Sequence, residues 1–170
     1  MTSQNQTNRP STAAPTGGRR HVFAELGTEQ PYDHVVLEVA RVVRVVKGGR
    51  RFSFRASVVA GNRAGSVGLG MGKSRDVQMA IQKAYQQAAK HMVTVCLAGG
   101  TLPGVVEAKY KGARVWLRPA QPGRGIIAGG TVRVVAGLAG VRDVVGKRHG
   151  SSNVVSNAGA ALRALASTCA

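Results

Sequence analysis

The chain has 170 residues, of which 44% are hydrophobic, and its 24 lysines and arginines against 7 acidic residues give a formal net charge of +17. That charge lies far beyond the magnitude of roughly 2–8 that keeps a small domain soluble, and such self-repulsion favours a polyanionic partner. No apolar run approaches the ~18 residues of a membrane-spanning helix, and the N-terminus lacks the apolar core of a signal peptide. The sequence therefore predicts one domain or two small ones that bind nucleic acid, with no membrane partner.

Residues 1–31 are rich in Ser, Thr, Gln, Asn, Pro and Gly and have few periodic apolar positions. Such a segment cannot bury enough apolar surface to offset the entropy lost on ordering, so it is predicted to be a disordered leader. It contains three arginines and two glutamates. An organellar transit peptide would be Arg-rich and acid-poor, so a bacterial host is favoured over an organelle.

The first structured segment begins at Tyr32 and includes a run rich in β-branched residues at 35–46. This composition predicts a strand for the latter part of the run, from which Arg41 and Arg44 project, whereas its start could be a short helix. The two glycines between Lys47 and Arg50 predict a turn.

The next ten residues have apolar side chains at every second position: Phe52, Phe54, Ala56 and Val58. This period predicts a half-buried antiparallel strand with one basic face. The two phenylalanines could stack on bases, but they share the phase of the apolar positions, which favours packing in the core. A turn at 61–65 and a strand at 66–69 complete a three-stranded meander.

A helix follows this meander. Ser74 is the predicted N-cap, and Asp76 lies in the first turn, where the helix dipole favours an anion. Its apolar positions have helical spacing: Val77, Ala80, Ile81, Ala84, Ala88 and Met92. This stripe is predicted to cover the sheet, which gives a small α+β unit over residues 32–95.

The second half, residues 96–170, forms the second predicted domain. A helix is predicted from Gly129 to Ala139, with Gly140 ending it, and a last helix follows a polar turn at 151–153. Strands are predicted at 94–97, 105–110, 113–120 and 141–148. Nine lysines and arginines but a single acid, Asp143, lie between Lys109 and Arg148. Because both halves are basic, we expect a large partner.

The segment Gly68–Ser74 reads GLGMGKS before a helix and raises the alternative of a nucleotide-dependent enzyme. A P-loop needs a glycine where this chain has Val67, and the dinucleotide fingerprint lacks the spacing of its third glycine. The few acids leave no plausible carboxylate pair, and no serine has His and Asp partners in a local motif. We therefore expect no catalysis and no cofactor. A further alternative is a free double-stranded-RNA or DNA binder.

The cysteines, Cys96 and Cys169, and the four histidines show no metal-ligand spacing. The two cysteines are also too few for a disulfide scaffold, so both are predicted to be buried or functionally unimportant thiols.

Four runs carry a resemblance to a known family: VVKGGRRFSFRA (45–56), GSVGLGMGKSRDV (65–77), PAQPGRGIIAGGTVRVVAGLAGVRDV (119–144) and GSSNVVSNAGAALRAL (150–165). In order and spacing they resemble the family of the bacterial-type ribosomal small-subunit protein number five. This chain departs from the family's second hairpin, usually Gly-Asp-Gly-Asn-Gly, because it reads GNRAG at 61–65.

The resemblance implies an α+β protein of two small domains. The first, residues 32–95, would be double-stranded-RNA-binding-like, with a three-stranded antiparallel sheet and a helix. The second, residues 96–170, would have a mixed α/β fold with a left-handed βαβ crossover.

The resemblance also implies a non-enzymatic constituent of the small subunit of the cytoplasmic ribosome. The family binds small-subunit rRNA at the back of the body near the head junction, steadies the head relative to the body and contributes to translational accuracy. Its implied protein partners are small-subunit proteins four and eight, with a functional link to protein twelve.

Site residues carry over by motif. The turn at 47–50 matches the one that reaches rRNA toward the head, and Arg51 would add a phosphate contact where the family often has an apolar residue. Residues 68–75 match a glycine-rich loop and helix start lying against rRNA, and residues 151–153 match a late polar turn. The predicted RNA-binding residues are Arg41, Arg44, Lys47, Gly48, Gly49, Arg50, Arg51, Gly68, Gly70, Gly72, Lys73, Arg75, Arg118, Arg124, Lys147, Arg148, Ser151, Ser152 and Asn153.

Overall fold

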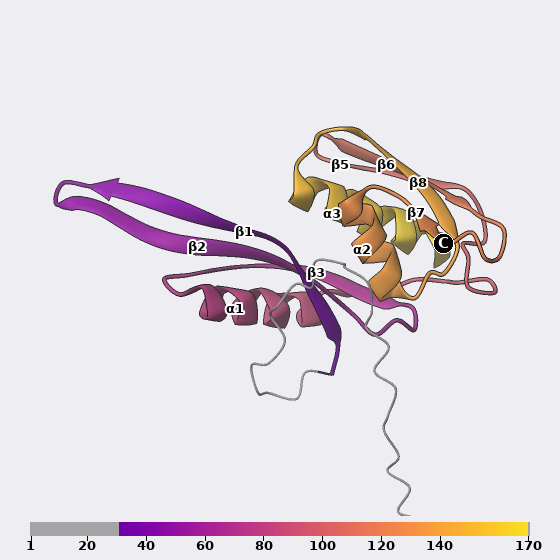
Figure 1. Cartoon of the computed structure of the whole chain (residues 1–170), viewed down its shortest axis with the longest axis horizontal. Coiled ribbons are helices and arrows are strands. Elements are labelled where there is room, and N and C mark those ends of the chain that lie inside the picture. The colour runs from indigo at the N-terminus through magenta and orange to yellow at the C-terminus, as the bar shows by residue number, and fades with distance from the viewer. Residues whose placement is uncertain (1–30, 170) are drawn as a thin grey trace, which may run out of the picture.

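The computed structural model describes residues 31–169, so all but the last residue of the predicted leader lies outside the described residues. The first part is an antiparallel sheet of order β1-β2-β3-β4, and α1 lies across one of its faces (Figure 1). Its elements are β1 (Asp33–Val46), β2 (Gly49–Gly61), β3 (Ser66–Ser74), α1 (Val77–Lys90) and β4 (Met92–Thr94). The sheet therefore has four strands rather than the predicted three, because the short β4 pairs with β3 after the helix.

β1 is a strand from its first residue, which excludes a helix at its start. β1 and β2 form a hairpin that is longer than the rest of the sheet. β3 pairs with β2 only as far as Phe54, whereas β1 and β2 stay paired out to Val46 and Gly49. The tip of the hairpin therefore projects from the body as an arm (Figure 1).

The glycines of the GLGMGKS segment lie inside β3, not in a loop. Gly68, Gly70 and Gly72 are buried beneath α1, and a Cβ built on each would come within 2.0–2.3 Å of a carbonyl oxygen of the helix. Every second position of the strand thus has to be glycine for α1 to lie this close. The prediction of a glycine-rich loop was wrong because composition alone does not distinguish a flexible loop from a strand packed against a helix backbone.

α1 begins later than predicted. Ser74 is the last residue of β3, and Asp76 is the N-cap residue, whose side chain makes no capping hydrogen bond. The predicted apolar stripe does face the sheet, since Ala80, Ala84 and Ala88 are fully buried. Small side chains at these positions match the glycines opposite, which lets strand and helix backbones approach.

The second part is a sheet of order β5-β6-β8-β7, in which β7 and β8 are parallel. Helices α2 and α3 pack on one side of it and lie between the two sheets (Figure 1). Its elements are β5 (Val106–Tyr110), β6 (Ala113–Pro119), β7 (Ile126–Ile127), α2 (Gly130–Ala139), β8 (Val144–Gly150), α3 (Val154–Ala166) and the 3-10 turn η1 (Ser167–Cys169). Both helices were predicted, and Gly140 ends α2 in the left-handed conformation (φ 90°). The two-residue β7 was not predicted because it is too short to show a period.

The two parts are joined where the β2–β3 turn meets the C-terminal end of α2. The amide groups of Arg63 and Gly65 donate to the carbonyl oxygens of Leu138 and Ala139, each at 2.9 Å. One hydrophobic cluster runs through this junction, from the first sheet to the inner face of the second.

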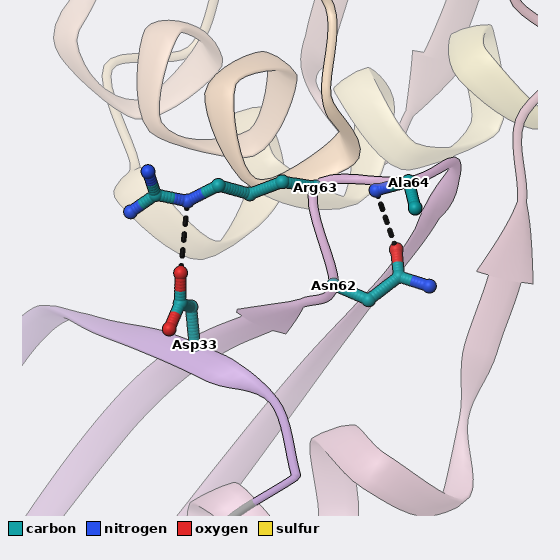
Figure 2. A network of polar contacts seen from close by, with 4 residues as sticks. All are labelled: Asp33, Asn62, Arg63 and Ala64. Atoms are coloured by element: carbon teal, nitrogen blue, oxygen red, sulfur yellow. Dashed lines mark hydrogen bonds and ion pairs between the residues drawn. The ribbon is translucent and has the colours of Figure 1, made fainter.

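In the β2–β3 turn, Asn62 stands where the family usually has an aspartate. Asn62 Oδ1 accepts hydrogen bonds from the amides of Ala64 (2.8 Å) and Ser66 (2.9 Å). Arg63 adopts a positive φ of 54°, and its Nε forms an ion pair with Asp33 Oδ2 at 2.8 Å (Figure 2). The asparagine oxygen thus takes the accepting role that an aspartate could have.

Cys96 and Cys169 form a disulfide, so the expectation of two separate thiols was wrong. The half-cystines are 73 residues apart in sequence and both are exposed. Their proximity depends on η1 returning to the end of the first sheet, where Thr168 Oγ1 accepts from the Cys96 amide. Local spacing, the basis of the expectation, carries no information on such a long-range contact.

Gly70→Ala should destabilise the fold by about 1–3 kcal/mol, because its Cβ would meet a backbone atom of α1 at 2.0 Å. Gly48→Ala is the matched control, since nothing lies within 4 Å of its Cβ. It should change stability by less than about 0.5 kcal/mol. Urea unfolding followed by circular dichroism measures both, and equal effects would contradict the packing role of Gly70.

Reduction of the disulfide should lower the free energy of unfolding by about 4 kcal/mol, as expected for a cross-link closing a loop of this length. The measurement is urea unfolding with and without reductant, with the bond followed by intact mass. The double variant Cys96→Ser/Cys169→Ser should unfold like the reduced chain and ignore reductant. A reduced wild type as stable as the oxidised one would refute the stabilisation.

Candidate nucleic-acid interface

The arm formed by β1 and β2 carries most of the predicted RNA-binding cations. Lys47 and Gly48 make the turn at its tip, and Gly49 follows with a φ of 127°. All the residues predicted there are exposed: Arg41, Arg44, Lys47, Gly48, Gly49, Arg50 and Arg51.

Four cations share the side of the first sheet opposite α1, and we call them the basic face: Arg44, Arg51, Arg55 and Lys73. In the strand register, Arg44 lies directly opposite Arg51, and Arg55 lies directly opposite Lys73. Like charges in such positions repel one another unless an anion lies between them. The sequence has no acidic residue from Val39 to Arg75; the nearest acid to Arg55 on this side is Glu38, which lies opposite Ser57 and forms no ion pair with Arg55. The basic face therefore places like charges next to one another across the strands.

Arg55 was missed as a site residue by sequence reasoning. The alternation of side chains along β2 could have indicated this residue, because it places Arg55 on the other side of the strand from the apolar positions. What the sequence lacked was the partner strand, whose register sets Lys73 beside it.

The two phenylalanines of β2 have different environments. Phe54 packs against the cluster beneath α1, as predicted. Phe52 is 47% exposed and has the Arg41 guanidinium 4.9 Å from its ring centre, so the prediction of core packing was wrong for this residue. Alternation gives the face on which Phe52 lies, but α1 begins only at Val77 and does not cover that part of the arm.

The structure divides the predicted segment 68–75. Lys73 belongs to the basic face and Arg75 is exposed in the bend before α1. The three glycines instead face the helix, so any RNA contact they make would be through the main chain. The nucleotide-loop alternative fails here too, because the segment is a paired strand with its glycines buried.

The predicted cations of the second part do not form one group. Arg118 of β6 and Lys147 of β8 lie on the side of the second sheet that no helix of residues 31–169 covers. Arg148 lies on the other side, beside Gly129 at the start of α2, and Arg124 is exposed in the turn before β7.

The polar turn before α3 is occupied by internal hydrogen bonds. Asn153 Oδ1 accepts from the Ser156 amide at 3.1 Å, and Ser151 Oγ accepts from the Asn153 amide. The buried Asn157 donates to the carbonyl oxygens of both Ser151 and Asn153. The turn therefore caps α3. RNA contact by Ser151, Ser152 and Asn153 stays a prediction.

The cations are mostly without acidic partners. Among residues 31–169, ion pairs join Arg63 to Asp33 and Arg114 to Glu107. The same residues contain no cluster of three or more His, Cys, Asp or Glu side chains that could hold a metal, and no helix long and apolar enough to cross a membrane. Positive charge without an acidic partner is thus the main chemical feature of the described surface.

Comparison with known proteins identifies the family. Residues 32–96 match the model of the N-terminal domain of ribosomal protein S5, and residues 108–170 match that of its C-terminal domain. The chain belongs to the ribosomal protein S5 family. The predicted family is thereby confirmed, together with the prediction of a ribosomal protein that is not an enzyme.

Relatives in this family come from diverse bacteria and carry the name small ribosomal subunit protein uS5. The one from Campylobacter jejuni strain 81-176 is 44% identical over 136 residues, covering 80% of this chain and 92% of the relative. The one from Trichormus variabilis is 44% identical over 149 residues, covering 87% and 86%. The one from Chromohalobacter salexigens is 49% identical over 132 residues, covering 78% and 80%.

Proposed function

We propose that this chain is a structural constituent of the small subunit of the cytoplasmic ribosome and binds rRNA with its basic face. The observation that carries the proposal is that two pairs of like charges lie directly opposite each other on neighbouring strands, Arg44 with Arg51 and Arg55 with Lys73. Phosphates placed between them would turn a destabilising repulsion into charge-assisted hydrogen bonds. Membership of the ribosomal protein S5 family supports rRNA as the polymer.

The length of the arm supports a role in bridging. Five residues of β1, 42–46, are paired to β2 beyond the last residue that faces β3. At a rise of about 3.3 Å per residue, they extend the arm by roughly 16 Å. An arm of this reach can contact RNA that the body of the protein does not touch. The proposed site is the back of the small-subunit body near the head junction, where the arm steadies the head relative to the body and contributes to translational accuracy.

The finer description of the fold also belongs to this proposal. The antiparallel sheet with α1 is consistent with a double-stranded-RNA-binding-like domain over residues 32–95. The parallel pair β7 and β8, connected through α2, is consistent with the left-handed βαβ crossover of a second domain over residues 96–170. Small-subunit proteins four and eight are the proposed neighbours, with a functional link to protein twelve.

The double variant Arg44→Gln/Arg51→Gln should weaken binding to small-subunit rRNA and reduce its dependence on salt. The slope of log affinity against log salt should fall by about 1 for each phosphate that is no longer neutralised, so by about 2. The free variant should be no less stable than the wild type, because the repelling pair is gone. Filter binding over a salt series and urea unfolding measure the two effects.

The matched control for that experiment is Lys83→Gln/Lys90→Gln. It removes the same charge from exposed positions of α1, on the other side of the first sheet. Its salt slope should match the wild type. Equal slopes for the two double variants would mean that net charge, and not the basic face, governs binding.

The place of the protein in the cell is tested by sedimentation. In a sucrose gradient of cell lysate, the chain should migrate with the small subunit and with whole ribosomes. A free double-stranded-RNA or DNA binder would stay in the slow fractions. Recovery there, with intact ribosomes in the same gradient, would sink the ribosomal assignment.

A further inference from the structure

We propose that the uncovered side of the second sheet is a further RNA site, in which a base stacks on Trp116 and neighbouring phosphates lie on the surrounding cations. The inference rests on the proposed function in taking RNA as the partner. It adds a site separate from the arm, with a different means of recognition.

The alternation of β6 creates this surface. Ala113, Val115 and Leu117 are fully buried toward α2 and α3, so the residues between them point to the other side. The strand register then sets side chains of β5 and β8 next to those of β6. We call the resulting set the outer face: Glu107, Lys109, Arg114, Trp116, Arg118, Lys147 and His149.

Trp116 lies at the centre of the outer face. Its direct neighbours across the strands are Glu107 on β5 and Lys147 on β8. It is the only tryptophan of the chain and is half-buried, and the hydrophobic cluster behind the sheet does not include it. A large aromatic ring left among cations, with no share in the core, is typical of surfaces that stack nucleobases.

An open hollow of about 310 Å³ adjoins the ring. It is lined by Trp116, Arg114, His149 and Glu107. That volume is at the lower end of the roughly 300–1,000 Å³ found for small-molecule sites. A single planar base with its sugar outside fits this description, since the hollow is open to solvent on one side.

The position of the single acid indicates where the base would lie. Glu107 is paired with Arg114 inside the hollow, where its carboxylate would repel a phosphate. The same carboxylate can accept a hydrogen bond from the amino group of a base, as acidic side chains do from cytosine. The remaining cations, Lys109, Arg118 and Lys147, are exposed around the hollow and are free to take phosphates. An acidic peptide would match these cations, but it would gain nothing from the ring and would be repelled by Glu107.

The outer face and the basic face are separate surfaces on different sheets. Helices α2 and α3 lie between the two sheets, so the outer face is turned away from the first sheet (Figure 1). The two sites can therefore be tested independently.

Trp116 itself reports on the proposed site, because the chain has no other tryptophan. A short single-stranded cytidine-rich RNA should quench its fluorescence in a saturable titration of the full chain. Polyglutamate of matched charge and inorganic polyphosphate should not. In filter binding, which does not need the tryptophan, Trp116→Leu should weaken binding of this RNA on the order of tenfold, whereas Trp116→Phe should keep most of the affinity because a ring remains.

The matched control is Arg44→Gln/Arg51→Gln, which should leave the quenching unchanged while weakening binding to whole rRNA. One outcome refutes the outer-face site and leaves the proposed function standing. In it, whole rRNA binds tightly, but the short cytidine-rich RNA does not quench Trp116 and binds Trp116→Leu as well as the wild type. If polyglutamate quenches as strongly as RNA, the surface takes acidic protein and this inference is wrong. Absence of binding to whole rRNA would instead overturn the proposed function. Should Trp116→Leu fail to fold by circular dichroism, the wild-type titrations still decide between these outcomes.

Discussion

The contact between the β2–β3 turn and the end of α2 is the constraint on which the rest of the structure depends. The last carbonyl groups of a helix have no partners within it and need donors from elsewhere. Here the amides of Arg63 and Gly65 supply them, so the capping of a helix in one part is done by the backbone of the other. The approach is possible only because Gly61 and Gly140 lack side chains, since a Cβ on either would come within 2.4 Å of a backbone oxygen.

This junction makes the two sheets one body. Val59 and Val67 of the first sheet are buried in the same cluster as Leu138 of α2, so separating the parts would expose a shared core and break the capping bonds. A protein that neutralises RNA with cations on a flexible linker would gain affinity without fixing geometry. A rigid body that presents the basic face on one sheet and Trp116 on the other fixes the geometry between these two surfaces.

The periodicity of apolar residues along the sequence predicted the features that depend on neighbouring residues in the chain. The period of two in β2 placed Phe54 in the core, and helical spacing located α1 and the end of α2 at Gly140. The register of neighbouring strands was not available from spacing, so the opposition of Arg55 to Lys73 was missed. Features set by long-range packing, such as the exposure of Phe52 beyond the start of α1 and the pairing of the cysteines, were predicted wrongly. The resemblance identified the family because it rests on four separated sequence runs taken together.

The glycines and cations of residues 47–75 illustrate why composition alone misleads. Together they resemble a phosphate-binding loop, since close backbone approach and positive charge are both needed there. In the structure the two requirements are separated onto opposite sides of one sheet. The glycines of β3 serve the approach of α1, and the cations of the basic face point away from it. The close approach of α1 to β3 leaves the other side of the sheet free of any helix of the first part. The packing of glycine against helix therefore belongs to one side of the sheet, and the four cations of the basic face belong to the other.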